Sequence, residues 1–481
     1  MLPTATRWRL LAIAGGLALL VLYLYGLDRM GLYSADEPRY ASIGREMARS
    51  GDFITPRLWG AGWFEKPPLL YWMVAAGFRA GLSIHLAPRV PVALLSLGFI
   101  AFFCWMVRRE FGAIAAAYST VILATACWWI ALSQVAVTDI PMSTMFGLAL
   151  LFTLPWLRSG DWRWLNAAAV ALGVAFLGKS GPPLILSLPV LWFGRERWRD
   201  LFRPTPVLLF LLIAVPWHVA CYLLNGPIFL KTLFLQQQLE RLYSPTLQHV
   251  QQWWFYIPLL PAVFFPWTPV LALLFRRDLY SDRRLRFLMA TAVWVFVFFS
   301  ASLNKLPFYL LPMVPPVAIV LGVALERAQL AGRVVLILSA LACCAFPELV
   351  TRLPGIMSRN PQVAAPELPI GLVVIVIVGL GAVCFIRDRT ASIAIVAMLA
   401  ATGYLWTKAE TFPFVDRAAT SRPVWQKIQS IQEPLCVKEL PRDWRYGLNY
   451  YTERPLPDCW QDPSIHTFLY FQNRQVLLAQ P

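Results

Sequence analysis

The stretch Leu86–Val107 reads LAPRVPVALLSLGFIAFFCWMV and carries a single charged residue, Arg89. An apolar run of about 20 residues can cross a hydrocarbon layer of roughly 30 Å as one helix. Backbone groups must pair internally in lipid, so repeated runs of this kind predict an all-α polytopic membrane protein of about thirteen transmembrane helices. The expected spans are 8–26, 86–107, 113–132, 140–157, 163–179, 181–194, 205–224, 256–275, 286–303, 307–325, 333–350, 369–386 and 391–407.

The composition of the whole chain supports this class. The 481 residues are 58% hydrophobic and only 14% charged, and the mean hydropathy is +0.58. The formal net charge of +16 is carried by arginines near the ends of the predicted spans. Short cytoplasmic loops retain such positive charge. We therefore interpret the basic residues as topology determinants and contacts to the membrane bilayer, and we expect no nucleic-acid partner.

Threading the spans with the arginine-rich loops inside places four segments on the outer face. These segments are the loop 27–85, the loop 225–255, the turn Asn304–Lys305 and the C-terminal tail. They hold most of the unusual polar chemistry of the chain. The sequence therefore predicts an extracytoplasmic site.

The tail after the last predicted span differs in composition from the rest. We expect a transmembrane domain over 1–407 and a small C-terminal extracytoplasmic α/β domain over 408–481. Cys436 and Cys459 lie in this tail, which the threading exports to an oxidising space, and we predict that they form a disulfide. The alternative for the tail is a lid or packing module without chemistry.

The first outer loop concentrates charges and aromatic residues between Ser34 and Trp72. DEPRYA begins at Asp36, and the apolar spacing after it predicts a helix lying in the membrane interface and ending at Gly51. A simpler interpretation gives Ser34 or Asp36 the role of helix cap. WFEKPPLLYW follows from Trp63, and its double proline holds Lys66 on a rigid segment, as suits a fixed cation for a phosphate.

Further candidates lie in the other outer segments. Asp139 in TDIP begins a span, where helix capping is the alternative role. Arg241 and His249 lie in the 225–255 loop, where Arg241 is a candidate anion ligand. Lys305 and Tyr309 lie in NKLPFYLLP, where a lysine at a span end is often a residue that only reaches toward the interface.

Together these stretches resemble the GT-C glycosyltransferases, in the branch of the lipid A aminoarabinose transferases that is related to protein O-mannosyltransferases. The residues that carry the likeness are DEPRYA from Asp36, WFEKPPLLYW from Trp63, TDIP from Thr138, LERL from Leu239, QHVQQWWFYIP from Gln248 and NKLPFYLLP from Asn304. DEPRYA followed by FEKPP is specific, and the others are individually weak. Where family members often carry a histidine before LERL, this chain has Gln238, which weakens any inference of a metal site.

The resemblance implies roles for individual residues. Asp36 would be the catalytic acidic residue and Asp139 a second catalytic acid near the acceptor side. Lys66, Arg241 and Tyr309 would hold the donor phosphate, and Glu65 would line the cavity. We also expect Arg39, Lys305 and His249 at the substrate cavity. The implied partners are a polyprenyl phosphate-linked sugar and lipid A, or another lipid or protein acceptor, at the periplasmic face of a bacterial inner membrane. The implied reaction is inverting glycosyl transfer, most simply of 4-amino-4-deoxy-L-arabinose from undecaprenyl phosphate.

Two alternatives and the cofactor question stay open at this point. A protein O-mannosyltransferase or another polyprenyl-phosphate-sugar transferase fits the same motifs. A lipid or solute transporter would instead use ionisable residues deep in the membrane, such as Lys179 at a Gly/Pro-flanked break. No Asp-x-Asp pair is present and the histidines show no ligand spacing, so the sequence requires no cofactor or metal, and a divalent metal stays uncertain.

Overall fold

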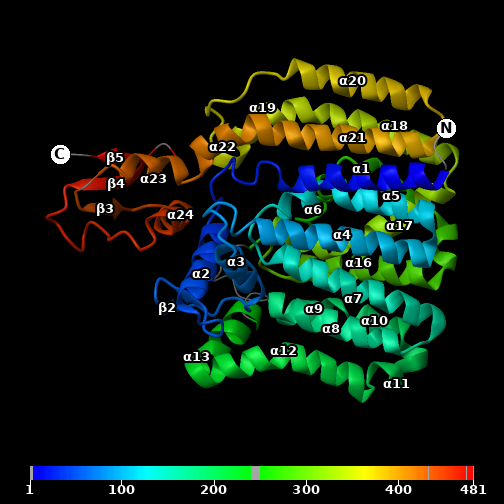
Figure 1. Cartoon of the computed structure of the whole chain (residues 1–481), viewed down its shortest axis with the longest axis horizontal. Helices are drawn as coiled ribbons and strands as arrows, with labels where there is room; N and C mark the ends of the chain where they lie inside the picture. The colour runs from blue at the N-terminus through cyan, green and yellow to red at the C-terminus, as the bar shows by residue number, and fades with distance from the viewer. Residues whose placement is uncertain (1–3, 240–249, 432, 473, 480–481) are drawn as a thin grey trace.

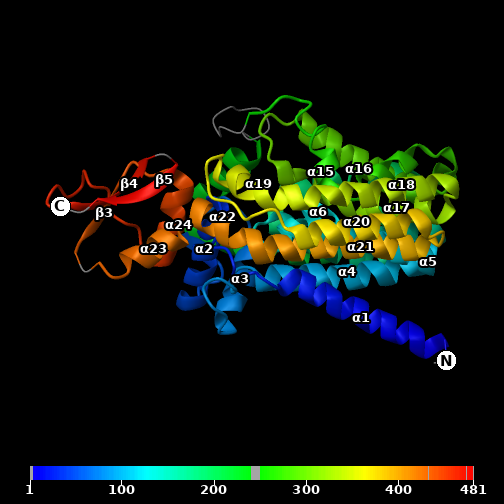
Figure 2. The same cartoon turned by 90° about the horizontal axis from the view of Figure 1, so that it is seen from above.

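The computed structural model describes residues 4–239, 250–431, 433–472 and 474–479. Long helices run side by side along one axis, and the C-terminal domain lies at one end of them next to α2 and α3 (Figure 1). The long helices are α1 (Thr4–Leu24), α4 (Val90–Phe111), α5 (Ala113–Thr125), α7 (Asp139–Ser159), α8 (Arg163–Lys179), α12 (Pro204–Asn225), α16 (Arg283–Ala301), α17 (Val314–Arg327), α18 (Leu330–Ala342), α19 (Phe346–Ser358), α20 (Ile370–Phe385) and α21 (Arg389–Trp406). Seen from above, α1 diverges from the others toward the N-terminus (Figure 2).

Shorter elements connect the long helices. The α-helical ones are α2 (Asp36–Ser50), α3 (Leu69–Arg79), α6 (Cys127–Leu132), α9 (Gly181–Leu186), α10 (Pro189–Phe193), α11 (Trp198–Leu201), α13 (Pro227–Leu230), α15 (Leu260–Val263) and α22 (Phe412–Ala419). The 3₁₀ and π segments are η1 (Arg195–Arg197), η2 (Lys231–Leu239), η4 (Thr268–Phe275), η5 (Arg277–Ser281), η6 (Pro307–Met313), η7 (Cys343–Ala345) and η8 (Thr407–Thr411).

Within the described residues, seven helical stretches are long and apolar enough to cross a membrane by length and composition. They are Val90–Phe111, Asp139–Ser159, Pro204–Asn225, Arg283–Ala301, Pro307–Arg327, Leu330–Ser358 and Arg389–Ala419. Shorter apolar helices at Ile13–Leu24, Ala113–Thr125, Gly181–Phe193 and Ile370–Phe385 coincide with further predicted spans. The chain is thus a multi-pass membrane protein, and the count of about thirteen spans stays a prediction.

The predicted span over 256–275 differs from the structure. The described backbone there contains only the short helix α15 and the 3₁₀ segment η4. Prolines at 258, 261, 266 and 269 remove backbone donors and obstruct helix continuation at short intervals. Apolar composition therefore predicted the location of this segment but not its conformation.

The predicted helix in the first outer loop is present as α2. It begins at Asp36 and ends at Gly51, whose φ of 75° is the left-handed conformation that glycine adopts without strain. The N-cap position is Ala35, which has no capping side chain, and the Ser34 hydroxyl accepts a hydrogen bond of 3.4 Å from the Asp36 backbone N–H. Capping therefore does not account for Asp36.

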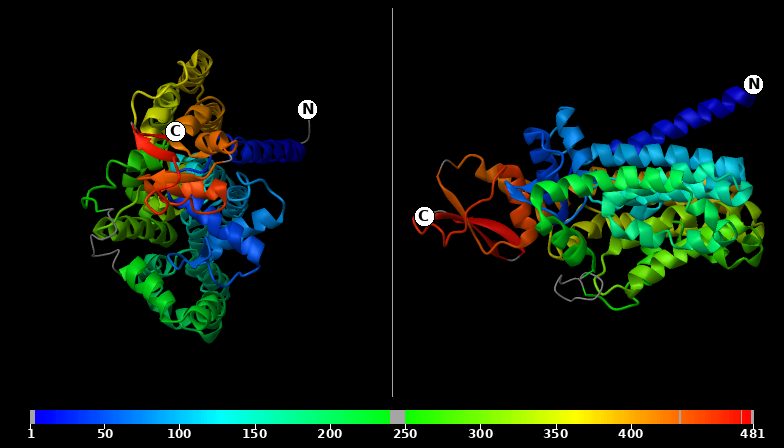
Figure 3. Two further views of the ribbon diagram at one scale, coloured as in Figure 1. Left: turned by 90° about the vertical axis from the view of Figure 1, so that its left-hand side faces the viewer. Right: turned by 90° about the horizontal axis from the view of Figure 1, so that it is seen from below.

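The C-terminal domain contains a three-stranded sheet and two helices at the same end as α2 (Figure 3). Strand β4 (Thr467–Gln472) lies centrally, parallel to β3 (Leu435–Lys438) and antiparallel to β5 (Gln475–Ala479). Helices α23 (Arg422–Ile428) and α24 (Arg442–Thr452) complete the domain, and Cys436 forms a disulfide with Cys459 as predicted. The small α/β domain expected from the tail is thus present.

A buried ion pair fixes the start of α2 against the helices. The Glu37 carboxylate is fully buried and accepts hydrogen bonds from Arg89 Nε and Nη2, each at 2.7 Å. Glu37 also accepts from the backbone N–H groups of Tyr33 and Ala136, at 2.8 and 3.1 Å. The remaining Arg89 donors bind backbone carbonyls of Leu27, Met30 and Gly31. One arginine at the start of α4 therefore joins the segment before α2, α2 itself and the turn before α7.

Replacing Arg89 by methionine should destabilise the protein strongly, because it leaves the buried Glu37 carboxylate without its cation. We expect the free energy of unfolding to fall by about 3 kcal/mol or more. Thermal unfolding of the detergent-solubilised protein measures the effect. The control is Arg352→Met, since Arg352 pairs with Glu348 on the exposed surface, and an exposed pair contributes about 0.5 kcal/mol. Equal losses in the two variants would contradict this role of the buried pair.

Candidate functional site

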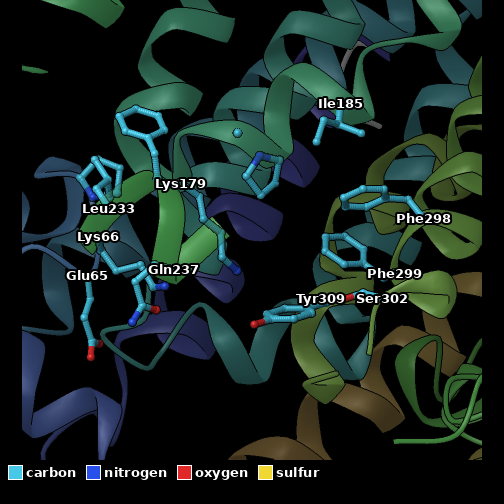
Figure 4. Close-up of a pocket in the computed structure, with 14 residues that line it drawn as sticks. Glu65, Lys66, Lys179, Ile185, Leu233, Gln237, Phe298, Phe299, Ser302 and Tyr309 are labelled. Atoms are coloured by element: carbon cyan, nitrogen blue, oxygen red, sulfur yellow. The ribbon is translucent and has the colours of Figure 1, made fainter. Parts of the chain in front are cut away.

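A cavity of about 310 Å³ opens where the first outer loop meets α8, α9 and η6. Its polar lining comes from Glu65, Lys66, Lys179, Gln237, Ser302 and Tyr309. In Figure 4, Glu65 and Lys66 lie on one side, Tyr309 lies on the other, and Lys179 approaches between them. The apolar lining includes Ile185, Leu233, Phe298 and Phe299. A cavity that combines two cations with aromatic and aliphatic walls suits an anionic head group attached to an apolar chain.

Local sequence explains how the loop presents Glu65 and Lys66. A two-stranded hairpin of β1 (Arg57–Leu58) and β2 (Ala61–Gly62) precedes them. Pro67 and Pro68 follow, and α3 begins directly after Pro68. Proline fixes its own φ and favours an extended residue before it. Lys66 is 8% exposed in this position, so a buried cation stands at the edge of the cavity.

Asp36 is linked to the cavity through Arg39. The Arg39 guanidinium forms ion pairs with Asp36 and with Glu65, the latter at 3.3 Å. The Arg39 side chain is 5% exposed, whereas that of Asp36 is 33% exposed. Burial alone would lower the pKa of Arg39, but Tyr40 and the two carboxylates raise it above its ordinary value. Arg39 is therefore a permanent cation between two acidic groups, one of which keeps access to solvent.

Asp139 reaches the same cavity through Lys179. It is the first residue of α7, but Thr138 holds the N-cap position and no side chain caps the helix. The alternative of Asp139 as a cap is therefore wrong. The buried Asp139 carboxylate accepts a hydrogen bond of 2.7 Å from Lys179 Nζ. The same ammonium group lies 4.3 Å from the centre of the Tyr309 ring.

The helix break after Lys179 sets its position. Ser180 has a φ of 24°, and the next helix begins with Gly181 and Pro182. Lys179 thus ends α8 and lines the cavity together with Gly181 and Pro182. Our candidate set did not include Lys179, although the lysine in GKSGPP at a break between two apolar runs was the available signal. Arg89 was missed too, because only the fold brings it to Glu37.

Lys305 does not line this cavity in the described residues. Its ammonium group donates to the backbone carbonyls of Ser302 and Gln251, the latter at 2.9 Å. Burial lowers the pKa of Lys305 from its ordinary value. A second cavity of about 370 Å³ includes Lys305 with Gln251 and Ser302. Lys305 therefore ties two outer segments together, and its expected substrate role stays a prediction.

Arg241 and His249 lie outside the described residues, so their expected roles also stay predictions. Among the residues that the structure describes, no group of three histidine, cysteine, aspartate or glutamate side chains could hold a metal ion. Of the other candidates, Glu65, Lys66 and Tyr309 line one cavity. Arg39 and Asp139 each connect to it through one ion pair, and Asp36 connects through its pair with Arg39.

Comparisons with known proteins agree with this architecture. A family model described as dolichyl-phosphate-mannose-protein mannosyltransferase matches residues 65–220. The undecaprenyl phosphate-alpha-4-amino-4-deoxy-L-arabinose arabinosyl transferase of Pseudomonas aeruginosa (strain UCBPP-PA14) is 31% identical over 353 residues, which cover 68% of this chain and 61% of that protein. A transferase of the same description from Pseudomonas fluorescens (strain Pf0-1), numbered 2, is 29% identical over 67% of this chain and 61% of its own length.

The chain thus spans about three fifths of the length of these curated relatives. A solved structure matches almost completely: the crystal structure of ArnT from Cupriavidus metallidurans bound to undecaprenyl phosphate. It superposes with a TM-score of 0.81 and 25% identity, covering 99% of this chain and 98% of that one. The helical architecture, the small C-terminal sheet and these likenesses together identify the chain as an ArnT-like protein of the GT-C glycosyltransferase fold.

Proposed function

We propose that this chain is an inverting glycosyltransferase that uses a sugar linked to undecaprenyl phosphate. The proposed sugar is 4-amino-4-deoxy-L-arabinose, and the proposed acceptor is a phosphate of lipid A at the periplasmic face of the bacterial inner membrane. The names of the two Pseudomonas relatives and the lipid bound in the solved ArnT structure support the donor. The arginine distribution supports the orientation of the site.

The observation that carries this proposal is the grouping of Lys66, Lys179 and Tyr309 around one apolar-walled cavity. Breaking the bond between a sugar and a lipid phosphate leaves negative charge on that phosphate. Ammonium groups and a phenol already held in place stabilise such charge without reorganisation during the reaction. We assign the donor phosphate to these three residues and its polyprenyl chain to the apolar side of the cavity.

Asp36 is the proposed catalytic acidic residue. Arg39 holds it next to Glu65, which itself lines the cavity. With a hydroxyl acceptor, Asp36 takes the proton of the attacking oxygen. With a phosphate acceptor, the nucleophile is already ionised, and Asp36 orients the substrate or stabilises positive charge at the anomeric carbon. The partial exposure of Asp36 suits contact with an incoming acceptor.

Asp139 is proposed to act on the donor side through Lys179. An unpaired lysine would be costly in this buried setting, and the ion pair with Asp139 orients Lys179 toward the cavity. Asp139 thus positions Lys179, the side chain that we propose binds the donor phosphate.

A protein O-mannosyltransferase is the second candidate, supported by the family model that matches residues 65–220. It would use the same donor-phosphate site with a protein hydroxyl as acceptor. A lipid or solute transporter would also bind a lipid phosphate in this cavity, but it would not need the carboxylate of Asp36. The three alternatives differ in which acceptor receives a sugar and in whether the Asp36 carboxylate is required.

The first experiment separates the ion pair from ligand binding. Lys179→Met leaves the buried Asp139 carboxylate unpaired and should lower the free energy of unfolding by about 3 kcal/mol. Adding Asp139→Leu removes both charges and should restore much of that loss, whereas sugar transfer should stay low because the phosphate ligand is still absent. Thermal unfolding and transfer rates of the wild type, both single variants and the double variant measure this. Recovery of transfer in the double variant would contradict a role for Lys179 in donor binding.

The second experiment tests the reaction itself. Asp36→Asn keeps nearly the same shape and removes the charge, so membrane abundance should persist while transfer is lost. Mass spectrometry of lipid A measures this in cells that make the aminoarabinose donor and express either form. Asp443→Asn, an exposed position in the C-terminal domain, serves as the matched control and should retain transfer.

A pentosamine on lipid A phosphate in the wild type and the Asp443→Asn control, but not in Asp36→Asn, supports the proposed function. Unmodified lipid A in every strain rules out this acceptor, and a mannosylated protein would then favour the second candidate. Full transfer by Asp36→Asn would remove Asp36 from the catalytic role.

A further inference from the structure

We propose that Tyr446, on helix α24 of the C-terminal domain, is a positioning residue that holds Arg39 against Asp36 and Glu65. This inference rests on the proposed function, since it concerns how the same site is kept ready for reaction. It gives the C-terminal domain a part in catalysis, in place of a lid or packing module without chemistry.

The first observation is the surroundings of the Arg39 guanidinium. The guanidinium forms ion pairs with the carboxylates of Asp36 and Glu65. Aromatic rings cover it otherwise: the guanidinium carbon lies 5.1 Å from the ring centre of Tyr40, 5.4 Å from Trp63 and 5.7 Å from Tyr446. A cation at such distances is attracted to the ring face. Tyr40 and Trp63 belong to the first outer loop, so Tyr446 is the contact that the other domain supplies.

The second observation is a strained tryptophan beside Tyr446. Trp59 occupies the turn between β1 and β2 with a φ of 53°, followed by Gly60 with a φ of 84°. Glycine and asparagine are the usual residues for such a turn, and a bulky side chain there is an outlier. The Trp59 ring packs on Tyr446 with ring centres 5.6 Å apart. Strain of this kind persists where surrounding structure maintains it and is concentrated at functional sites.

The third observation is a set of unsatisfied donors in the same cluster. Arg39 Nε and the indole N–H groups of Trp59 and Trp63 are buried and have no hydrogen-bond partner in the described structure. A buried donor without a partner costs about 1–3 kcal/mol. Oxygen atoms of a bound sugar or phosphate would satisfy these donors. The cluster that surrounds Arg39 therefore keeps hydrogen-bonding capacity that protein groups do not use.

The fourth observation is that α24 is docked rigidly on α2. Arg45 donates to the Tyr450 carbonyl at 2.6 Å, and Arg49 forms two hydrogen bonds with Glu453 at 2.8 and 2.9 Å. The Tyr450 hydroxyl donates to the carbonyl of Ile84 at 2.5 Å. These contacts fix the helix that carries Tyr446 relative to the helix that carries Asp36 and Arg39. Tyr446 thus contacts Arg39 from a helix whose position relative to α2 is set by these hydrogen bonds.

The test uses the full-length protein in nanodiscs with the undecaprenyl phosphate-linked sugar as donor and lipid A as acceptor. Tyr446→Ala should lower kcat by about tenfold to a hundredfold, as misplacement of a catalytic group does. The KM for the donor should stay unchanged, because the proposed phosphate ligands Lys66, Lys179 and Tyr309 are untouched. Tyr446→Phe keeps the ring over Arg39 and should retain the wild-type kcat.

Trp444→Ala is the control for a merely structural role. Trp444 lies two residues before Tyr446 on α24, on a different face of the helix, and belongs to the core of the C-terminal domain with Phe471 at 6.4 Å. This variant should lower the melting temperature and leave kcat largely intact. An equal loss of kcat in Trp444→Ala and Tyr446→Ala overturns the proposal, as does a Tyr446→Phe variant that is as slow as Tyr446→Ala.

A second measurement keeps the inference separate from the proposed function. If the wild type transfers no sugar, the proposed function fails, and the position of Arg39 in a cryo-EM structure of Tyr446→Ala then decides the inference. Loss of the Arg39–Glu65 ion pair supports it. Retention of that pair at its present distance overturns it.

Discussion

The buried ion pair between Glu37 and Arg89 is the interaction on which the site depends. It fixes the first turn of α2 against α4 and the turn before α7. The residues next to Glu37 then inherit defined positions: Asp36 faces partly outward and Arg39, one turn later, faces Glu65. Burying the charges of Glu37 and Arg89 has a desolvation cost. Four further hydrogen bonds between these side chains and backbone groups offset it. Of the two adjacent acidic residues, Asp36 is thus the catalytic candidate and Glu37 is a structural residue.

Two sets of ion pairs reach the cavity. Asp36, Arg39 and Glu65 form one set, and Asp139 with Lys179 forms the other. The first is proposed to serve the acceptor and the second the donor phosphate. Each cation is paired with a carboxylate, which orients it in a poorly hydrated setting. A phosphate-linked sugar bound between these two sets of ion pairs would have its leaving phosphate next to Lys66 and Lys179. Its anomeric carbon would then face Asp36 and Glu65.

The sequence predicted the membrane class, the helix from Asp36 and the C-terminal α/β domain. Apolar runs and turn residues are local signals, so these features were accessible. That Glu65, Lys66 and Tyr309 share one cavity was implied only by the resemblance to the GT-C family. Arg89 and Tyr446 were not selected, because each acts through a partner far away in the chain that only the tertiary fold identifies. Lys179 was considered only in support of a transporter, although its position at a break between two apolar runs was a local signal. The conformation of 256–275 was missed because hydropathy does not register how closely spaced prolines interrupt a helix. Arg241 and His249 lie outside the described residues and stay predictions.

A cryo-EM structure of this protein with undecaprenyl phosphate tests the central claim most directly. The account predicts the phosphate within hydrogen-bond distance of Lys66 Nζ and the Tyr309 hydroxyl, next to Lys179, with the polyprenyl chain along Ile185, Phe298 and Phe299. A phosphate bound elsewhere, with these three side chains in contact with protein groups only, would contradict it.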